Sequence, residues 1–458
     1  MSSPVEVRPR VKRFGLVGNP LAHSLSPLIH ERIMEAVGLK GSYELFDLAP
    51  NELPRELPRL LASLDGFNCT IPHKQAVIPY LKDLAPSAKL YGAVNTVCQS
   101  WGYNTDGVGF ASCGVPLQGQ RVCVFGAGGV ARVLAMEAAR AGATSIAVQA
   151  RNAEQATGLV DAVRKQGYGQ IHALAEGADS TCDVILNGTP VGMWPNLAGT
   201  PVSNRQIEGA KAVFDTIYNP SATGLVLRAK SRGLWAMGGL QMLFEQALAA
   251  QRIWNPEVDW ENFTDGLRGA GRGLALEVLR RSPFKLVLTG FMGSGKTQVG
   301  QALAQRLGSA LNKSAPSFVD LDHRVVIRAG QSIPEIFRSQ GEAAFRSLER
   351  DLFAEELQRP GAAIVATGGG TLIQEGLAEM VRRSGGFIVY LDVSLEEALR
   401  RIGRDDQRPL LQRGPEEIRV LYDLRKPLYE EAADLRVVAD GKVSDIVEMI
   451  MTAFRWNG

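Results

Sequence analysis

Short apolar runs alternate with amphipathic stretches along most of the chain. The runs RVCVFG (residues 121–126), SIAVQA (145–150) and CDVILN (182–187) have the composition of buried strands, and helical patterns such as VARVLAMEAARAG (130–142) stand between them. Apolar strands separated by helices are typical of parallel sheets that are covered by helices. The pattern therefore predicts an α/β protein throughout.

The pattern changes near residue 266. The stretch DGLRGAGRGLALEVLRRSP (265–283) contains glycines and arginines but no clear strand, and a new apolar strand, FKLVLTG (284–290), follows it. A chain of 458 residues is long enough for two or three domains. We therefore expect a linker at residues 266–282 between two halves.

Composition describes an ordinary globular protein without a strong overall charge. Apolar residues make up 45% of the chain, and 50 Lys and Arg nearly cancel 48 Asp and Glu, so small-molecule partners are expected, with no nucleic acid and no membrane. No apolar run approaches the roughly 18 residues of a membrane span. The five cysteines form no C-x-x-C pair, which favours a reducing, cytoplasmic location. An oligomer is compatible with the sequence.

A phosphate-binding loop follows the strand pattern of the second half. Residues 290–297, GFMGSGKT, precede the helical pattern QVGQALAQRLG and match G-x-x-x-x-G-K-[ST]. Glycines let backbone N–H groups wrap phosphate oxygens at a helix N-terminus, Lys296 reaches the outer phosphates, and the Thr297 hydroxyl can ligate Mg²⁺. We expect a nucleotide to be held by Gly293, Ser294, Gly295, Lys296 and Thr297. The loop alone does not identify the phosphoryl acceptor.

Further motifs narrow the reaction of the second half. They are DLD (320–322), a stretch with Arg346 and Glu349, GGG (368–370), QRPLL (407–411) and RKPLY (425–429). In this order they resemble the shikimate kinase family from residue 284 to the C-terminus. Arginine forks suit a small anionic acid, and phosphoryl transfer needs positioning and charge neutralisation. Arg346 and Glu349 also have the spacing of an ordinary surface ion pair on a helix, which remains an alternative.

The kinase resemblance implies that the nucleotide is ATP, and it implies a role for each motif. It implies that Asp322 contacts the acceptor hydroxyl as base or orienter, and that Asp320 helps Thr297 to place Mg²⁺. Lys296 and Arg408 then neutralise the phosphates, Arg408 from a mobile lid, and Arg401 lies near the adenine. The residues implied to hold shikimate are Arg346, Gly369, Gly370 and Arg425.

A dinucleotide loop stands in the first half. Residues 126–131, GAGGVA, follow a strand, open a helix and match G-x-G-x-x-[GA], so Gly126, Ala127, Gly128, Gly129 and Val130 are expected to approach a pyrophosphate. The next strand runs into Arg151 rather than an acidic residue, and a cation suits the 2′-phosphate of NADP better than the bare ribose of NAD. An ordinary solvated arginine is the alternative.

Motifs on both sides of this loop carry a second resemblance. They are GNPLAHSLSP (18–27), GFNCTIPHK (66–74), GAVNT (92–96), NTDG (104–107), NGTPVGM (187–193), YNP (218–220) and GLQMLFEQ (239–246). Together they resemble the shikimate dehydrogenase family over residues 12–265. The resemblance implies that Lys74 and Asp106 form the catalytic pair and that Gly239 contacts the cofactor. The residues implied to hydrogen-bond the substrate are Ser24, Ser26, Asn68, Thr70, Asn95, Tyr218 and Gln246.

The chemistry of the first half agrees with this resemblance. Reduction of a ketone by hydride needs a proton donor at the nascent alkoxide, and a lysine beside a carboxylate can deliver that proton, while a nicotinamide carries the hydride. Two structural alternatives stay open. Lys74 and Asp106 can form a surface salt bridge, and Ser24 and Ser26 can cap the following helix.

Together the two resemblances imply a bifunctional α/β enzyme. A substrate lobe of residues 1–108 and 240–265 would carry a Rossmann-like NADP lobe of residues 109–239, and residues 283–458 would form a P-loop domain of the nucleoside-monophosphate-kinase type with a parallel sheet and a lid. The first half is expected to reduce 3-dehydroshikimate to shikimate with NADPH, and the second to phosphorylate shikimate with MgATP. Two other interpretations remain: a first half that acts on quinate with NAD, and one half that is inactive and regulatory.

Overall fold

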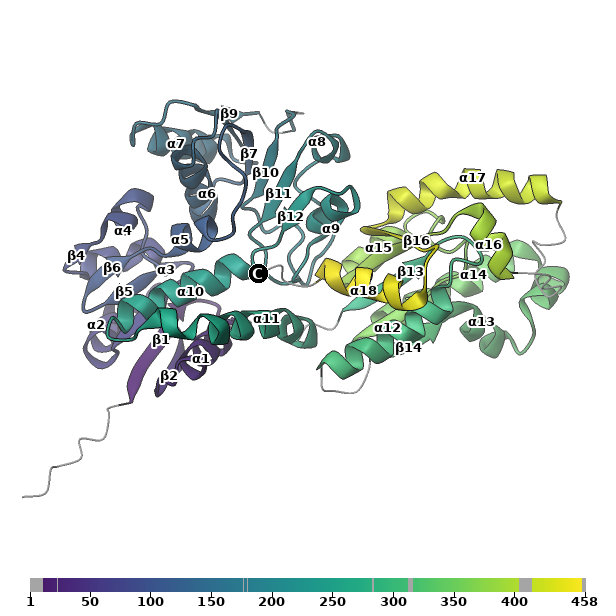
Figure 1. Cartoon of the computed structure of the whole chain (residues 1–458), viewed down its shortest axis with the longest axis horizontal. Helices are drawn as coiled ribbons and strands as arrows, with labels where there is room; N and C mark the ends of the chain where they lie inside the picture. The colour runs from purple at the N-terminus through teal and green to yellow at the C-terminus, as the bar shows by residue number, and fades with distance from the viewer. Residues whose placement is uncertain are drawn as a thin grey trace, which may run out of the picture. The chain divides into compact units, whose positions relative to one another are not determined.

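The computed structural model describes residues 11–22, 24–175, 177–178, 180–281, 284–311, 316–402 and 414–454. The chain divides into two compact units, which Figure 1 colours by residue number. The first unit contains residues 1–189 and 239–274, and the second contains residues 190–238 and 275–457.

A six-stranded mixed sheet, in the order β2-β1-β3-β5-β6-β4, is the base of the first unit. Strand β1 pairs in parallel with β2 and β3, while β5 runs antiparallel to β3 and to β6. The strands are β1 (Lys12–Gly18), β2 (Gly41–Asp47), β3 (Gly66–Cys69), β4 (Asp83–Leu84), β5 (Thr96–Cys98) and β6 (Trp101–Tyr103). The helical segments that follow them are α1 (Ser26–Ala36), α2 (Leu53–Ser63), α3 (His73–Ala76), η1 (Ile78–Tyr80), α4 (Pro86–Tyr91) and α5 (Asp106–Ala111).

Helix α10 (Leu240–Trp254) returns to this first sheet from much later in the chain. Its last residue, Trp254, stacks on Phe14 of β1 with ring centroids 4.8 Å apart and donates its indole N–H to the Val97 carbonyl at 2.9 Å. A Cβ on Gly66 would lie 2.2 Å from the Trp254 indole nitrogen, so glycine is required there for the indole to approach. This packing holds the helix that carries Gln246 against the first sheet.

Four parallel strands follow in the first unit, in the order β10-β7-β8-β9. Strand β8 lies on one side of β7 and β10 on the other, so the strand order reverses at β7. In sheets of this kind, dinucleotides usually bind at the loop where the order reverses, which is the loop after β7. The elements are β7 (Arg121–Phe125), α6 (Gly129–Arg140), β8 (Ser145–Gln149), α7 (Ala153–Arg164), β9 (Ile171–Leu174) and β10 (Val184–Asn187).

The second unit contains a five-stranded parallel sheet, in the order β14-β15-β13-β16-β17. Its strands are β13 (Lys285–Thr289), β14 (Ser317–Asp320), β15 (Ala363–Ala366), β16 (Gly386–Asp392) and β17 (Leu435–Val438). Its helices are α12 (Lys296–Leu311), α13 (Leu321–Ala329), α14 (Ile333–Gln358), α15 (Leu377–Arg383), α16 (Leu395–Ile402), α17 (Pro415–Ala432) and α18 (Val443–Phe454). The phosphate-binding loop leaves β13 between β15 and β16, again where the strand order reverses.

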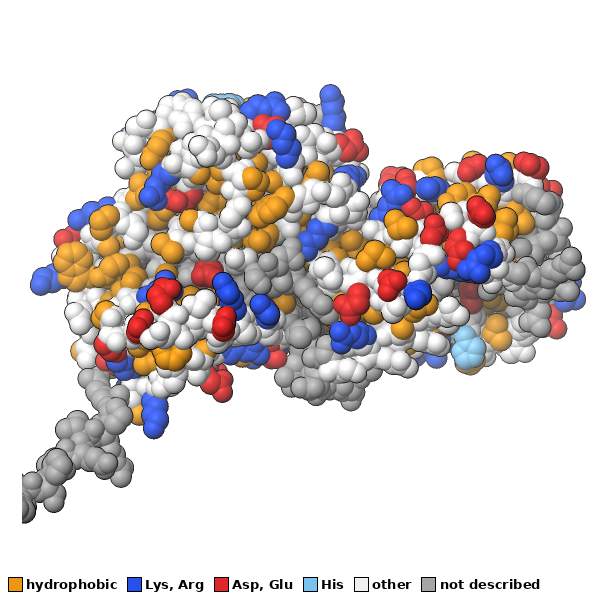
Figure 2. Space-filling view, viewed as in Figure 1, with side chains coloured by type: hydrophobic (Ala, Val, Ile, Leu, Met, Phe, Trp, Pro, Cys, Tyr) orange, Lys and Arg blue, Asp and Glu red, His pale blue; other side chains and the backbone are white. Residues whose placement is uncertain are grey.

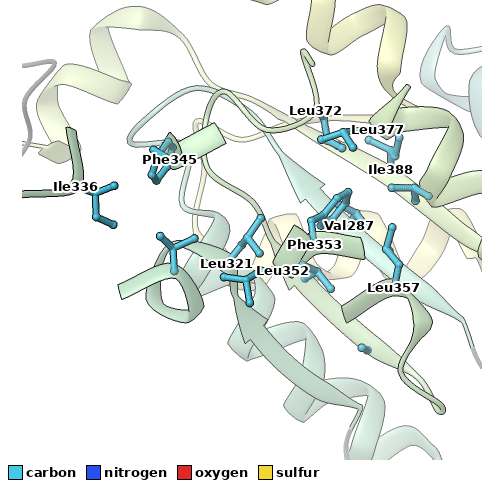
Figure 3. Packing of buried hydrophobic residues seen from close by; sticks show 14 residues of the cluster. Val287, Leu321, Ile336, Phe345, Leu352, Phe353, Leu357, Leu372, Leu377 and Ile388 are labelled. Atoms are coloured by element: carbon cyan, nitrogen blue, oxygen red, sulfur yellow. The ribbon is translucent and has the colours of Figure 1, made fainter. Parts of the chain in front are cut away.

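One hydrophobic cluster forms the core beside this sheet. Figure 3 shows side chains of β13 and β16 packed against α13, α14 and α15, with Val287, Phe353 and Ile388 fully buried. Burial of one such side chain stabilises the fold by about 1.5–3 kcal/mol. The cluster therefore fixes α13 and α14, the two helices that carry Asp322 and Arg346.

The edge strand β17 of the second unit is covered by an earlier segment of the same unit. This segment contains α8 (Asn204–Glu208), β11 (Ala212–Asp215), α9 (Gly224–Ser231) and β12 (Trp235–Met237). The Arg436 N–H donates to the Ser231 hydroxyl at 2.9 Å, and the Lys230 ammonium donates to the Ala453 carbonyl at 2.9 Å. The buried Asp434 carboxylate pairs with both Arg228 and Arg382. The sheet edge is thus paired with polar groups of α9 and is not left bare.

The α/β prediction is confirmed. Most of the range expected to be a linker, residues 266–282, is helix α11 (Thr264–Arg281), which follows the short η2 (Trp260–Phe263). Within the described ranges, no helix has the length and apolarity that crossing a membrane would require. On the face that Figure 2 shows, acidic and basic side chains are interspersed.

Candidate active sites

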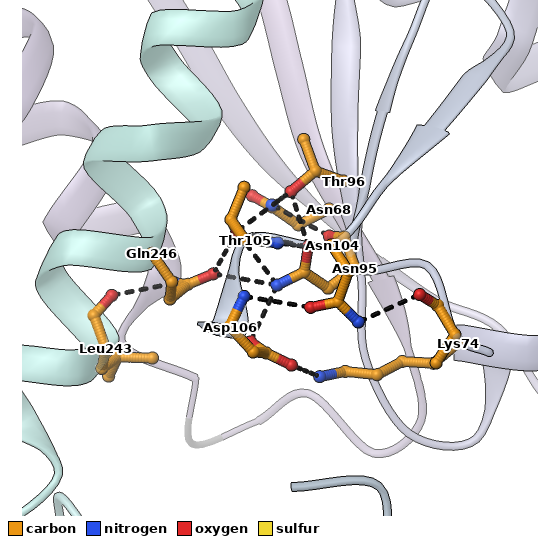
Figure 4. A network of polar contacts seen from close by, with 10 residues as sticks. Asn68, Lys74, Asn95, Thr96, Asn104, Thr105, Asp106, Leu243 and Gln246 are labelled. Atoms are coloured by element: carbon orange, nitrogen blue, oxygen red, sulfur yellow. Dashed lines mark hydrogen bonds and ion pairs between the residues drawn. The ribbon is translucent and has the colours of Figure 1, made fainter. Parts of the chain in front are cut away.

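An ion pair between Lys74 and Asp106 is the centre of the polar cluster in the first unit. Lys74 lies on α3 and Asp106 is the first residue of α5, and their charged atoms are 2.6 Å apart (Figure 4). The side chains are 27% and 12% exposed, so the pair is largely shielded from solvent. An ammonium held in this way is positioned to donate a proton to a bound molecule. A fully exposed ion pair would instead contribute little to stability.

Asn95 fixes the orientation of Asp106. Its amide nitrogen donates to the second carboxylate oxygen of Asp106 at 2.8 Å and to the Thr105 hydroxyl at 3.0 Å. Its amide oxygen accepts the Thr105 N–H at 2.8 Å, and the Gln246 amide oxygen lies 3.5 Å from the Asn95 nitrogen. The structure thus brings Lys74, Asp106, Asn95 and Gln246 together from four separate segments of the chain (Figure 4). In this arrangement the amide of Asn95 is largely taken up in holding Asp106.

Asn68 is held by three hydrogen bonds next to this pair. Its amide nitrogen donates to the Asn95 carbonyl at 3.0 Å and to the Thr96 hydroxyl at 3.1 Å, while its oxygen accepts the Tyr43 hydroxyl at 2.8 Å. His30 stacks on Tyr43 with ring centroids 4.1 Å apart. Burial lowers the pKa of His30 to about 3, with a smaller opposing effect of Asn68, so this ring is neutral. The Asn68 amide oxygen retains one lone pair that can accept a hydrogen bond from a ligand hydroxyl.

Of the remaining substrate residues expected from the sequence, Ser26 lies beside the Tyr43 hydroxyl, and Tyr43 in turn binds Asn68. Ser26 is the first residue of α1, and its N–H donates to the Ser24 hydroxyl at 3.2 Å, so Ser24 has a structural bond at the helix start. Thr70 follows β3, and its N–H donates to the Val17 carbonyl at 2.9 Å. Tyr218 follows β11 in the other compact unit, and burial raises the pKa of its hydroxyl.

The dinucleotide loop has the shape of an open cradle. Gly126 adopts a φ of 104°, and an added Cβ there would lie 3.0 Å from the Gly188 carbonyl, so the tight turn requires glycine. Added Cβ atoms on Gly128 and Gly129 would meet open space, so close packing within the protein does not explain these two glycines. The open space leaves room for a phosphate group to approach the backbone at the start of α6. Val130 is in the first turn of α6, Arg151 is exposed after β8, and Gly239 precedes α10.

The phosphate-binding loop of the second unit is closed around its lysine. The Lys296 ammonium donates to the carbonyls of Gly290 at 2.8 Å and Phe291 at 3.0 Å. Gly293 and Gly295 have φ values of 76° and 86°, which favour glycine. The backbone therefore has the curvature that a row of phosphate oxygens requires, with Lys296 at its centre.

The Thr297 hydroxyl and the Asp320 carboxylate lie together beside this loop. The Thr297 hydroxyl donates to the Asp320 carboxylate at 2.7 Å, and the other Asp320 oxygen caps α13. Mg²⁺ bound to a nucleotide takes one or two protein oxygens and completes its shell with phosphates and water. The described ranges contain no cluster of three or more histidine, cysteine or acidic side chains that could hold a metal, and a nucleotide-borne Mg²⁺ does not need one.

Arg346 and Glu349 do not form a surface pair. Glu349 is fully buried and binds Arg346 at 2.8 Å, while it also accepts the Thr371 hydroxyl at 2.6 Å and the Gln374 amide at 2.9 Å. An added Cβ on Gly368 would lie 2.8 Å from the Glu349 carboxylate and 2.9 Å from that of Asp322. The absence of a side chain at Gly368 is thus what allows both carboxylates to lie against the loop that follows β15.

Three further groups expected from the sequence meet at the same loop. An added Cβ on Gly370 would lie 2.7 Å from the Arg346 guanidinium, and the Arg425 guanidinium donates to the Gly369 carbonyl at 3.3 Å. Two arginines therefore flank Gly369 and Gly370, as binding of a small carboxylate requires. Arg401 lies on α16, where it pairs with Glu397 at 2.7 Å. Arg408 lies outside the described residues.

Some functional groups could not be identified from the motifs. Thr105 lies in the NTDG motif, which indicates no role for it, and Tyr43 and Thr371 lie in none of the motifs. Tyr43 follows an alternating strand pattern, which gives no indication that its hydroxyl reaches Asn68. The sequence indicates Glu349 only as a partner at helical spacing, and its complete burial depends on how α14 lies against the loop after β15.

Comparison with known proteins agrees with both halves. The family model "Shikimate dehydrogenase substrate binding domain" matches residues 16–97, and the model "Shikimate kinase" matches residues 292–455. The chain is 36% identical over 273 residues to the shikimate dehydrogenase (NADP(+)) of Caldanaerobacter subterraneus subsp. tengcongensis, which covers 56% of this chain and 97% of that protein.

Solved structures give the same result for the first half. A chorismate mutase/shikimate 5-dehydrogenase fusion protein from Clostridium acetobutylicum has a TM-score of 0.53 at 31% identity, covering 59% of this chain and 99% of the other. Shikimate 5-dehydrogenase from Thermus thermophilus, in complex with NADP(H) and shikimate, has a TM-score of 0.50 at 32% identity, covering 57% and 100%. The chain therefore belongs to the shikimate dehydrogenase family and carries a shikimate kinase domain in its C-terminal part.

Proposed function

We propose that this chain catalyses two consecutive reactions of aromatic amino acid biosynthesis. The first is the NADPH-dependent reduction of 3-dehydroshikimate to shikimate, and the second is the transfer of the γ-phosphoryl group of ATP to the 3-hydroxyl of shikimate. The observation that carries the proposal is the Lys74–Asp106 ion pair, 2.6 Å long and held by Asn95, in a stretch that aligns with shikimate dehydrogenases along nearly their whole length. The product of the first site is the acceptor for the second.

In the reductase, Lys74 and Asp106 act as one unit. The Lys74 ammonium hydrogen-bonds the ketone oxygen and gives it a proton as negative charge develops there, while Asp106 holds the ammonium in place. Ser24, Ser26, Asn68, Thr70, Asn95, Tyr218 and Gln246 are proposed to bind the hydroxyls and carboxylate of the substrate. When bound, the nicotinamide supplies the hydride.

NADP fits the first half better than NAD. The open space at Gly128 and Gly129 supports close approach of a pyrophosphate at the start of α6, with Gly126, Ala127 and Val130 completing the turn. Arg151 is proposed to pair with the 2′-phosphate, and Gly239 to lie near the cofactor. The names of the relatives, which include NADP(+), support this preference.

In the kinase, the protein positions the two substrates and neutralises the charge of the phosphates, and no side chain bonds covalently to the phosphoryl group. Gly293, Ser294, Gly295 and Lys296 bind the phosphates, Thr297 and Asp320 hold Mg²⁺, and Arg401 and Arg408 contact the nucleotide. Arg346, Arg425, Gly369 and Gly370 are proposed to bind the shikimate carboxylate and ring hydroxyls. Asp322 is proposed to contact the 3-hydroxyl as base or orienter. The buried Glu349 supports this assignment because it keeps the Arg346 fork in one orientation.

The domain organisation that we propose is the one expected from the motifs. Residues 1–108 and 240–265 form the substrate lobe, 109–239 the cofactor lobe, and 283–458 the kinase. We propose a cytoplasmic enzyme, which is supported by five cysteines that are all free. Its partners are small molecules.

One coupled assay tests the function. The full chain is supplied with 3-dehydroshikimate, NADPH and MgATP, and NADPH oxidation and ADP release are followed together. We expect ADP release only after NADPH oxidation has produced shikimate, and immediate ADP release when shikimate is added directly. If quinate is turned over with NAD faster than 3-dehydroshikimate is reduced with NADPH, the proposed first reaction is wrong. If no ADP is released when shikimate is added, the proposed second reaction is wrong.

A further inference from the structure

The motif RKPLY ends in Tyr429, to which the proposed function assigns no role. Tyr429 lies on α17, is 1% exposed, and directs its hydroxyl to the Gly369 carbonyl, which also accepts the Arg425 guanidinium. Burial raises the pKa of Tyr429 to about 12, with Arg425 opposing the change, so the hydroxyl remains a donor at neutral pH. Two donors, one neutral and one charged, therefore converge on a single carbonyl oxygen.

The orientation of this carbonyl determines the direction of a neighbouring N–H. The Gly369 carbonyl and the Gly370 N–H belong to one planar trans peptide group, in which they point in opposite directions. Because the Gly369 oxygen faces Tyr429, the Gly370 N–H faces away from α17. Glycine on both sides of this peptide offers little resistance to its rotation, so the hydroxyl of Tyr429 is a substantial constraint on it.

The Gly370 N–H is a donor at the place where the acid is proposed to bind. Within the part of the chain that the structure describes, this N–H has no hydrogen-bond partner. The Arg346 guanidinium lies directly against Gly370, since an added Cβ would be 2.7 Å from it. A backbone donor and an arginine fork are thus adjacent, which is the arrangement that binds a carboxylate or ring hydroxyl.

We propose that Tyr429 is a positioning residue for the phosphoryl acceptor. Its hydroxyl holds the Gly369–Gly370 peptide so that the Gly370 N–H points at the bound acid beside Arg346. The inference rests on the proposed kinase function and adds a specificity element to that site. Tyr429 acts through the peptide and does not touch the reacting atoms.

The matched pair Tyr429→Phe and Tyr390→Phe tests the proposal in the full chain. Tyr390 is a suitable control because it is 1% exposed, packs against Tyr429 with ring centroids 5.4 Å apart, and donates its hydroxyl to Asp392 at 2.9 Å instead. Each variant loses one hydroxyl from the same buried pair. Steady-state ADP release gives KM for shikimate and for MgATP, and calorimetric titration with shikimate gives its binding constant independently of turnover.

We expect Tyr429→Phe to raise KM and the dissociation constant for shikimate about 5- to 10-fold, the effect of one lost neutral hydrogen bond, with KM for MgATP unchanged. Tyr390→Phe leaves KM for shikimate unchanged. Equal effects of the two variants, or a fall in kcat and melting temperature with shikimate binding unaltered, would overturn the proposal. NADPH oxidation by the same protein reports that the chain is intact. If wild-type protein releases no ADP with shikimate, the proposed function fails instead.

Discussion

Gly370 and Gly369 offer a sharp test of the acceptor site because one added methyl group has different neighbours at each position. On Gly370 it would lie 2.7, 2.9 and 3.0 Å from the Nη2, Nη1 and Cζ atoms of Arg346. On Gly369 its neighbours would be the Gly290 carbonyl at 3.6 Å, and Arg425 and Tyr429 at 3.7 Å, which are ordinary contacts. Neither glycine adopts a positive φ, so alanine causes no backbone strain at either.

The expected consequence of Gly370→Ala is a displaced Arg346 in a folded protein. The guanidinium is the far end of a flexible side chain and can move, but it then leaves the position in which Glu349 holds it, and the buried carboxylate loses its cation. Hydrogen bonds to a charged group contribute about 1.5–3 kcal/mol, and each 1.4 kcal/mol is tenfold in binding. KM for shikimate should therefore rise about 10- to 100-fold in Gly370→Ala, while Gly369→Ala changes it by less than about threefold.

The assay follows ADP release at fixed MgATP with varied shikimate, and then at fixed shikimate with varied MgATP. KM for MgATP should remain within about twofold in both variants, because the phosphate-binding loop is not touched. Thermal unfolding and NADPH oxidation serve as checks on folding. The reasoning is refuted if the two alanine variants have the same KM for shikimate, or if Gly369→Ala is the more damaging change.

Three other predictions concern the independence of the two activities, the choice of coenzyme and the pH dependence of stability. Lys74→Ala should lower the rate of NADPH oxidation by at least about 100-fold, because the proton donor is lost, and should leave ADP release intact. Lys296→Ala should abolish ADP release and leave NADPH oxidation intact. Loss of both rates in either folded variant would contradict independent sites. Arg151→Ala should raise KM for NADPH about tenfold and leave KM for NADH unchanged, because only NADPH carries the 2′-phosphate; equal shifts for both coenzymes would exclude this role. The pKa of His30 falls from 6.5 to about 3 on burial, so between these values the unfolded chain binds a proton that the folded chain does not, and stability decreases as pH falls. Denaturant unfolding of His30→Asn and of the wild type should be compared across this pH window. The free energy of unfolding of the variant should change with pH by up to about 1.4 kcal/mol per pH unit less than that of the wild type. An equal slope in the two proteins would show that His30 does not cause the pH dependence.

Residues that act through a local backbone motif could be predicted from the sequence. The glycines of both loops, Lys296 and Thr297 lie at a fixed distance from a strand end and a helix start, which the sequence displays directly. The α/β architecture follows from the same alternation of apolar strands and helices. Lys74 and Asp106 are separated in the chain, and the resemblance to a family was needed to pair them.

Residues that act through distant packing could not be predicted in this way. The hold of Asn95 on Asp106 depends on the turn between β5 and β6, and the burial of Glu349 depends on how α14 lies against the loop after β15. Tyr43 reaches Asn68 only because β2 and β3 flank β1 in the first sheet. Cover of β17 by α9 requires contact between residues about 200 positions apart, and no local pattern encodes it.

The cover over β17 determines where this polypeptide can be divided. A kinase fragment that begins at residue 283 would lose Ser231 as the acceptor for the Arg436 N–H, Arg228 as one of the cations on Asp434, and Lys230 as the donor to the Ala453 carbonyl. The fragment would then present a bare sheet edge, on which strands of other molecules can assemble. Poor solubility of such a piece would thus reflect the missing α9 and would not indicate a defective catalytic centre. Point variants that silence one site are the better means of isolating each activity.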